Sequence, residues 1–270
     1  MMAARFFAKA AWDYTILLLG ALLLALECFT WALVALLLNV LLPAATARRV
    51  GRVGAMWGFR AYLAVMEALG AWRLDLEELD TLRDVGPVII APNHPCLLDA
   101  VLLVSRLPNA VCVMKGALLT NFLLGPAARL ARYVRNDSLV RLVARSREEL
   151  CAGGQLLLFP EGTRSVAQPV GPFTEAVGAL ARRCNVPVQV VIIEANSGFL
   201  GKGWSIAARP DLPLVYRARL GRRFDPPRDV RAFTVELERY FSRELASRNA
   251  AQVVPDCAVA AVQDAHRIRG

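Results

Sequence analysis

The first 47 residues are far more apolar than the rest of the chain. Residues 15–42 contain little polarity apart from Glu27 and Asn39, and Pro43 follows them. As one helix this run would extend about 42 Å, more than the roughly 30 Å of a bilayer's hydrocarbon core. A carboxylate such as Glu27 is costly in hydrocarbon. Residues 1–47 are therefore predicted to be a membrane anchor, either one tilted helix or a helical hairpin, with a bend or a buried partner for Glu27 near its middle. A cleaved signal peptide is the alternative, but its apolar region is usually shorter.

Basic residues follow the apolar run directly. They alternate with apolar side chains and include Arg48, Arg49, Arg52 and Arg60. This pattern predicts that residues 48–70 form a basic amphipathic helix on an anionic membrane surface. Basic residues tend to stay on the cytoplasmic side of a membrane, so the following domain is expected to face the cytoplasm. The alternative is a core helix whose arginines are solvated.

From residue 71 onward, short apolar runs alternate with helical stretches. The predicted strands are Trp72–Leu76, Val88–Ala91, Ala110–Met114, Tyr133–Arg135, Leu156–Phe159, Val188–Ile193 and Leu214–Leu220. The predicted helices are Leu97–Arg106, Gly116–Leu130, Ser138–Ala152, Phe173–Cys184 and Val230–Leu245. This alternation predicts an α/β fold with a mostly parallel sheet of about seven strands, flanked by helices, and ligands at the carboxyl ends of the strands. The domain is expected to span residues 71–250, followed by a weakly ordered tail at 251–270.

Composition narrows the class of partner. The chain is 56% hydrophobic, with a mean hydropathy of +0.41, which exceeds the range usual for soluble domains and favours a membrane protein. Its net charge of +9 suits anionic lipid, a phosphorylated substrate or nucleic acid, but no nucleic-acid module is visible. The six cysteines form no C-x-x-C pair, which fits reduced thiols in a cytoplasmic setting and indicates no metal site.

The segment Asn93-His94-Pro95-Cys96-Leu97-Leu98-Asp99 follows a predicted strand. Pro95 suits the first position of a helix, which would place His94 between the strand and a helix N-terminus. A carboxylate on one imidazole nitrogen fixes the tautomer and leaves the other nitrogen free to take a proton from a hydroxyl. His94 is therefore a candidate general base oriented by Asp99. In the alternative interpretation His94 caps the helix, and Asp99 only complements its dipole. A nucleophilic Cys96 is a further alternative, although such a thiol more often packs as a small apolar residue.

A second polar turn follows a later apolar strand and reads Phe159-Pro160-Glu161-Gly162-Thr163-Arg164-Ser165. Gly162 permits a close backbone approach that a side chain would block. Arg164 offers a planar fork suited to a phosphate group. Taken alone, this turn is more readily interpreted as an exposed loop with a surface arginine.

Together the two segments resemble the 1-acylglycerol-3-phosphate acyltransferase family of membrane-bound glycerolipid acyltransferases. The first matches the family's N-H-x-x-x-x-D block, and the second matches F-P-E-G-T-R-S at every position. Residues 113–119 resemble the family's lysine-led segment, and residues 132–136 resemble the block with a substrate-facing arginine. Residues 186–190 resemble the final valine-proline block. The resemblance covers about residues 70 to 220, with the blocks in family order.

The resemblance implies an O-acyltransferase that needs no cofactor and no metal. An acyl group would move from acyl-CoA or acyl carrier protein to the free hydroxyl of a lysophospholipid, with 1-acylglycerol-3-phosphate giving phosphatidic acid as the leading case. His94 and Asp99 would be catalytic. The acceptor's phosphate would lie against residues of the second block, Glu161, Gly162, Thr163 and Arg164. Lys115 and Arg135 would contact the head group or the carrier's phosphate.

Two departures from the family pattern leave the acceptor open. Ala117 stands where the lysine-led block commonly has an acidic residue, and Phe173 is followed by Thr174 rather than lysine. The same chemistry on a lyso-ornithine lipid, glycerol-3-phosphate or a specialised polyene-type lipid therefore remains an alternative. So do a thioester hydrolase and a non-catalytic, basic, membrane-binding scaffold.

Overall fold

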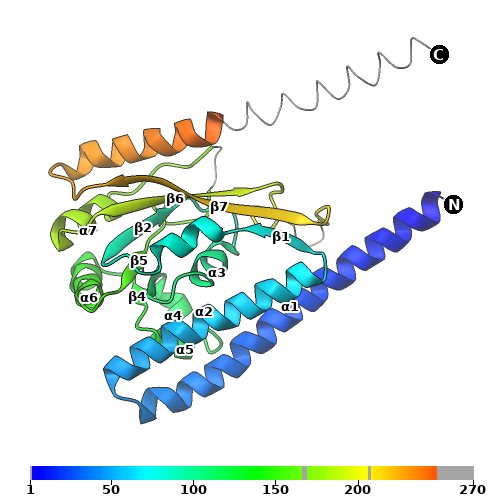
Figure 1. Ribbon diagram of the computed structural model, residues 1–270, viewed down its shortest axis with the longest axis horizontal. Helices are drawn as coiled ribbons and strands as arrows, with labels where there is room; N and C mark the ends of the chain where they lie inside the picture. Colours follow the sequence, from blue (N-terminus) through cyan, green and yellow to red (C-terminus); the bar gives the residue numbers. More distant parts are fainter. Residues whose placement is uncertain (1, 166–168, 206–207, 248–270) are drawn as a thin grey trace.

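The structure is a computed structural model that describes residues 2–165, 169–205 and 208–247. The predicted tail at 251–270 lies outside the described residues. The chain begins with two long helices, α1 (Met2–Leu41) and α2 (Ala44–Ala68), which lie side by side and run in opposite directions (Figure 1). They join directly at residues 42–43, so the hairpin is formed by α1 and α2 together.

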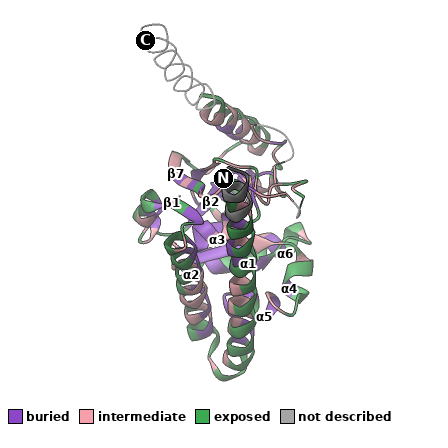
Figure 2. Cartoon of the chain, turned by 90° about the vertical axis from the view of Figure 1, so that its right-hand side faces the viewer, coloured by how far each residue is buried: buried purple, intermediate pink, exposed green. Residues whose placement is uncertain are grey.

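Helix α1 is continuous, and the bend considered near Glu27 is absent. The Glu27 carboxylate lies directly over Gly58 of α2, where any side chain would collide with it. The absence of a side chain at Gly58 lets the carboxylate pack against α2, so the helix needs no break to accommodate it. By length and composition, residues 9–41 could cross a membrane. Figure 2 shows α1 largely exposed, in contrast to the buried α3 (Asp99–Val104).

The α/β fold with a mostly parallel seven-stranded sheet is confirmed. The strands in the described residues are β1 (Trp72–Asp75), β2 (Val88–Pro92), β3 (Ala110–Met114), β4 (Val134–Arg135), β5 (Gln155–Leu157), β6 (Val188–Ala195) and β7 (Leu214–Phe224). Their order in the sheet is β1-β7-β6-β2-β5-β3-β4. Every neighbouring pair is parallel except β6 and β7. The carboxyl ends of β2, β5, β3 and β4 therefore meet at one edge of the sheet.

Helices cover both faces of the sheet. Besides α1 to α3 they are α4 (Gly116–Thr120), α5 (Gly125–Leu130), α6 (Leu139–Cys151) and α7 (Ala176–Cys184), a 3-10 helix at Glu77–Leu82, and a helix at residues 230–247. Side chains alternate between the faces along each strand. Val88 and Ile90 of β2 pack in one core with α2 and α3, whereas Ile89 packs in a second core with α6, α7 and the final helix.

Two of the predicted helices differ from the structure in ways that have a visible local cause. Helix α3 begins at Asp99 rather than Leu97, so Pro95 is not its first residue. The reason is local: the Cys96 N–H donates to the Asp99 carboxylate and the Leu97 N–H donates to the Leu200 carbonyl. The predicted helix at 116–130 is split into α4 and α5 because the Asn121 side chain accepts the N–H groups that follow it.

A buried ion cluster joins α2 to α6. Arg52 is buried, and its guanidinium contacts Glu149 and also donates to the Ala131 carbonyl at 3.1 Å. Arg48 contacts the same carboxylate at 2.9 Å. Two of the four arginines expected to face a membrane therefore point into the protein. Arg49 is exposed, and Arg60 lies over the Trp57 ring.

Glu149→Gln is expected to destabilise the protein by about 3 kcal/mol, because it leaves the buried Arg52 charge without a partner. The matched control is Glu148→Gln on the same helix, since the Glu148 side chain is 47% exposed and that of Glu149 only 4%. Thermal unfolding in detergent measures both variants. A Glu149→Gln protein that unfolds at the same temperature as the control would contradict the role given to the cluster.

Candidate active site

Two loops meet where β2 and β5 end. These strands are parallel neighbours in which Ile90 lies opposite Leu157, so the residues that follow each strand emerge side by side. As a result the His94 ring stacks on the Phe159 ring, with centroids 3.9 Å apart and planes inclined by 21°. The two sequence motifs thus form one site, as their common position after a strand predicted.

The His94 ring is held by Asp99. Its Nδ1 lies 2.7 Å from Asp99 Oδ2. The Cys96 N–H donates to the same oxygen at 2.9 Å, and the Cys96 thiol donates to the other oxygen at 3.0 Å. Asp99 is fully buried, and burial raises the pKa of its carboxyl, while the hydrogen bonds from His94 and Cys96 oppose that rise. A buried carboxylate in this position orients the ring and stabilises the imidazolium formed when the ring takes a proton.

The backbone around His94 is fixed from both sides. Asn93 makes two hydrogen bonds with the backbone of Ile193 on β6, one as donor at 2.8 Å and one as acceptor at 2.7 Å. On the β5 side, the Ser165 N–H donates to the His94 carbonyl at 2.8 Å. The His94 side chain remains 16% exposed, so one edge of a firmly held ring reaches the surface.

Glu161 organises the second loop rather than facing outward. Its carboxylate is buried and accepts hydrogen bonds from the Ser165 hydroxyl at 2.6 Å and from the Gly171 N–H at 2.8 Å. A longer contact of 3.4 Å joins it to the His94 N–H. Gly162 and Thr163 are exposed at the tip of the loop, and Gly162 has a φ of +65°, a conformation that favours glycine.

Arg164 connects the site to a loop between β6 and β7. Its Nη1 donates to the carbonyls of Leu200 at 2.9 Å and Gly201 at 3.2 Å. The Leu200 carbonyl also accepts the Leu97 N–H, and a side chain at Gly201 would press on the carbonyls of Gly198 and Pro95. Nothing in the sequence indicated this loop, because its contacts use backbone atoms that any residue would supply.

The other two predicted site residues lie further along the same edge of the sheet. Lys115 follows β3, is exposed and has no ion-pair partner in the part of the chain that the structure describes. Arg135 ends β4, pairs with Asp137 at 2.8 Å and lies over Gly116. Strands are about 4.8 Å apart, which separates β3 from β2 by roughly 10 Å and β4 from β2 by roughly 14 Å. The structure therefore brings His94, Asp99, Glu161 and Arg164 together and leaves Lys115 and Arg135 at a distance.

Cys96 does not have the character of a nucleophile. Its side chain is buried, and burial together with the nearby Asp99 charge raises its pKa far above the usual range. A thiol that stays protonated at neutral pH attacks poorly, since the thiolate is the reactive form. Its contribution here is the pair of hydrogen bonds to Asp99.

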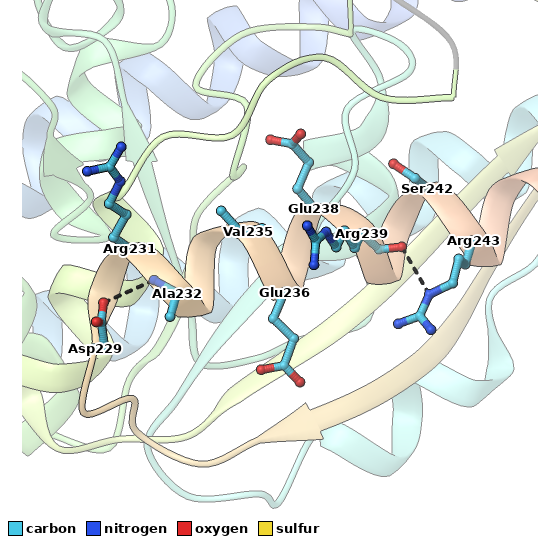
Figure 3. A pocket seen from close by; sticks show the side chains of 9 residues that line it. All are labelled: Asp229, Arg231, Ala232, Val235, Glu236, Glu238, Arg239, Ser242 and Arg243. Atoms are coloured by element: carbon cyan, nitrogen blue, oxygen red, sulfur yellow. Dashed lines mark hydrogen bonds between the residues drawn. The ribbon is translucent and has the colours of Figure 1, made fainter.

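Two cavities lie outside this pair of loops. One of about 880 Å³ borders the final helix, where acidic and basic side chains such as Arg231, Glu236 and Arg243 alternate (Figure 3). It contains none of the predicted site residues. The other, of about 600 Å³, includes Arg135. Across the described ranges, no group of three or more metal-ligating side chains is placed to hold a metal ion.

Comparison with known proteins identifies the domain that carries these loops. Residues 73–194 match the model of the acyltransferase family, and this range contains all five sequence blocks. Within residues 73–194 the chain is therefore similar to this family. Its sequence is 24% identical over 148 residues to "Putative 1-acyl-sn-glycerol-3-phosphate acyltransferase acl-1" of Caenorhabditis elegans. That match covers 52% of this chain and 56% of the relative, so the chain matches little more than half of the relative's length.

The structural similarity to a solved protein extends beyond residues 73–194. The crystal structure of the 1-acyl-sn-glycerophosphate (LPA) acyltransferase PlsC from Thermotoga maritima superposes with a TM-score of 0.63 at 17% sequence identity. The match covers 93% of this chain and 98% of that one. A match this extensive includes α1 and α2 as well as the sheet, so the N-terminal hairpin is part of the shared architecture.

Proposed function

We propose that this protein is an O-acyltransferase that moves a fatty acyl group from acyl-CoA or acyl carrier protein to the free hydroxyl of a lysophospholipid. The leading acceptor is 1-acylglycerol-3-phosphate, which would give phosphatidic acid. The observation that carries the proposal is the His94–Asp99 pair at 2.7 Å, placed beside a loop that bears Arg164. The name of the C. elegans relative and the family match support the same chemistry.

In the proposed reaction the acceptor hydroxyl attacks the carbonyl carbon of the thioester. With Nδ1 engaged by Asp99, His94 Nε2 takes the hydroxyl proton as the new ester bond forms. The carbon–sulfur bond then breaks, and the proton leaves with the thiol of the carrier. No covalent enzyme intermediate is needed because the thioester is already activated. Asp99 compensates the positive charge of the imidazolium while it exists.

Arg164 is the proposed ligand of the acceptor's phosphate. Its loop adjoins His94, and only Nη1 of its guanidinium is hydrogen-bonded to the described residues. A hydroxyl and a phosphate on adjacent glycerol carbons are only about 5 Å apart, so the phosphate must bind close to the base. Gly162 and Thr163 would shape this pocket, and Lys115, which lies further along the sheet, is proposed for the carrier's phosphate. We also propose that α1 anchors the domain to the cytoplasmic face of a membrane.

His94→Ala is expected to lower kcat for acyl transfer by about 10²–10⁴-fold, the usual contribution of a general base. The variant should still fold, because the His94 ring lies at the edge of the sheet, where it stacks on Phe159 and contacts Asp99. Radiolabelled acyl-CoA or acyl carrier protein with a lysophospholipid acceptor provides the assay. Full activity in this variant would refute the mechanism. Free fatty acid released without any acceptor would instead indicate a thioester hydrolase, and no turnover by the wild type would indicate a scaffold.

Arg164→Gln is expected to raise KM for 1-acylglycerol-3-phosphate about tenfold, because a charge-assisted hydrogen bond to phosphate is lost. Glutamine keeps an N–H donor for the Leu200 carbonyl, so the loop should persist. The matched substrate is a 1-acylglycerol without phosphate, for which the rate should not change. An equal loss of acyl-transfer rate with both acceptors would show that Arg164 only supports the loop.

A second group of acceptors is favoured by one specific feature. Thr174, where the family often has lysine, donates its N–H and its hydroxyl to the Pro160 carbonyl behind the second loop. It therefore supports the loop and adds no positive charge near the head group. A lyso-ornithine lipid, glycerol-3-phosphate or a specialised polyene-type lipid is thus the alternative acceptor, and a panel of these compounds in the same assay ranks them.

A further inference from the structure

The cavity of about 600 Å³ is rich in arginine. It is lined by the side chains of five arginines from α5, the turn before β4, β4 itself and α6, namely Arg129, Arg132, Arg135, Arg141 and Arg145. Only Arg135 was singled out by its sequence, because the other four are scattered over 17 residues and gather only in the fold. A volume of this size suits a small-molecule group such as a lipid head group.

The positive charge of this arginine pocket is only partly neutralised. Arg135 pairs with Asp137, and Arg145 pairs with Glu148 outside the pocket. The other acidic lining residue, Glu149, is already bound by Arg48 and Arg52 of α2. Neither Arg132 nor Arg141 has a carboxylate partner within the described part of the chain. Such a group of arginines attracts an anion.

Exposed apolar side chains lie on the segments that form the arginine pocket. Outside α1 and α2, the large hydrophobic residues exposed in the described structure are Leu97, Leu118, Phe122, Leu139, Val140, Val215 and Val235. Four of these seven lie between residues 118 and 140, on the segments that form the pocket. The pocket is also lined by Asn39, near the end of α1, which donates to the Pro126 carbonyl at 3.1 Å. Arginines beside exposed apolar groups and an apolar helix are typical of a membrane interface.

We propose that the arginine pocket binds the head group of an anionic phospholipid of the membrane, with the acyl chains lying against Leu118, Phe122, Leu139 and Val140. This lipid is a structural ligand and not the acceptor. The inference rests on the proposed function only in placing α1 at a membrane. It moves the basic membrane contact from α2, where the sequence placed it, to the surface formed by α4, α5 and α6.

Geometry separates this lipid from the acceptor. The pocket contains no residue of the loops at 93–99 or 159–165, and β4 lies about three strand spacings, or roughly 14 Å, from β2. A phosphate held between Arg132 and Arg141 is therefore too far away to belong to an acceptor whose hydroxyl lies about 5 Å from its phosphorus. The apolar surroundings favour a lipid over the polar arm of a soluble acyl donor.

The test uses the full chain in a neutral detergent and measures binding of dioctanoyl phosphatidylglycerol, with dioctanoyl phosphatidylcholine as the uncharged comparison. The double variant Arg132→Gln/Arg141→Gln is expected to weaken phosphatidylglycerol binding about tenfold or more, as expected for lost charge-assisted contacts. Arg147→Gln is the control, because Arg147 is exposed on α6, the helix that carries Arg141, but does not line the pocket. Val140→Ser should weaken binding of the lipid but not of inorganic phosphate.

Each alternative outcome overturns the proposal in a recognisable way. Equal phosphatidylglycerol binding by wild type and double variant would show that the pocket is not the lipid site. Inorganic phosphate binding as tightly as the lipid would indicate a simple anion site. Competition by coenzyme A for the pocket, together with a KM for the acyl donor that is raised in the double variant but not in the control, would assign the pocket to the acyl donor. Failure of the proposed function would appear separately, as absent turnover with unchanged lipid binding.

Discussion

The candidate site depends on one buried carboxylate. Asp99 bonds the ring of His94 and both the backbone and the thiol of Cys96, and it is also the first residue of α3. Taking a charge out of water is costly unless partners compensate it, which is why three donors converge on this group. Because the loop closes around Asp99, the ring it holds has a fixed direction. The stacked Phe159 and the bonds from Asn93 to β6 then place that ring at the edge of the sheet.

Buried ion pairs also connect the N-terminal helices to the α/β domain. Arg52 of α2 reaches Glu149 on α6, and Asp13 of α1 is buried in an ion pair with Arg209 at 3.0 Å. Arg209 lies in the connection between β6 and β7, which also supplies the Leu200 and Gly201 carbonyls bound by Arg164. The apolar helix and the loop beside His94 are thus held in one framework. The proposed acyl transfer to a membrane lipid would require the base at a defined position relative to the membrane, and these contacts would provide it.

The sequence predicted the parts that follow from local pattern. The strands were recognisable as short apolar runs, and the predicted bounds of β3 agree with the structure at both ends. The contact between His94 and Asp99 followed from the five-residue spacing of the two residues. Contacts made by backbone carbonyls could not be predicted, because any residue can supply them, as at Leu200. The positions of charged residues that become buried were also predicted wrongly. Arg48 and Arg52 were expected at the surface, because the sequence does not show that Glu149 lies opposite them. The arginine pocket likewise depends on how α5, β4 and α6 pack.

The proposed mechanism requires that His94 carry its proton on Nδ1, toward Asp99, and present Nε2 as an acceptor. The chain contains only two histidines, His94 and His266, so nitrogen-15 NMR of histidine-labelled protein can resolve the ring directly. The proposed mechanism predicts one histidine in the Nδ1–H tautomer, and this signal should change in Asp99→Asn. Two histidines with the averaged signals of freely exchanging imidazoles, or a ring protonated on Nε2 alone, would contradict it.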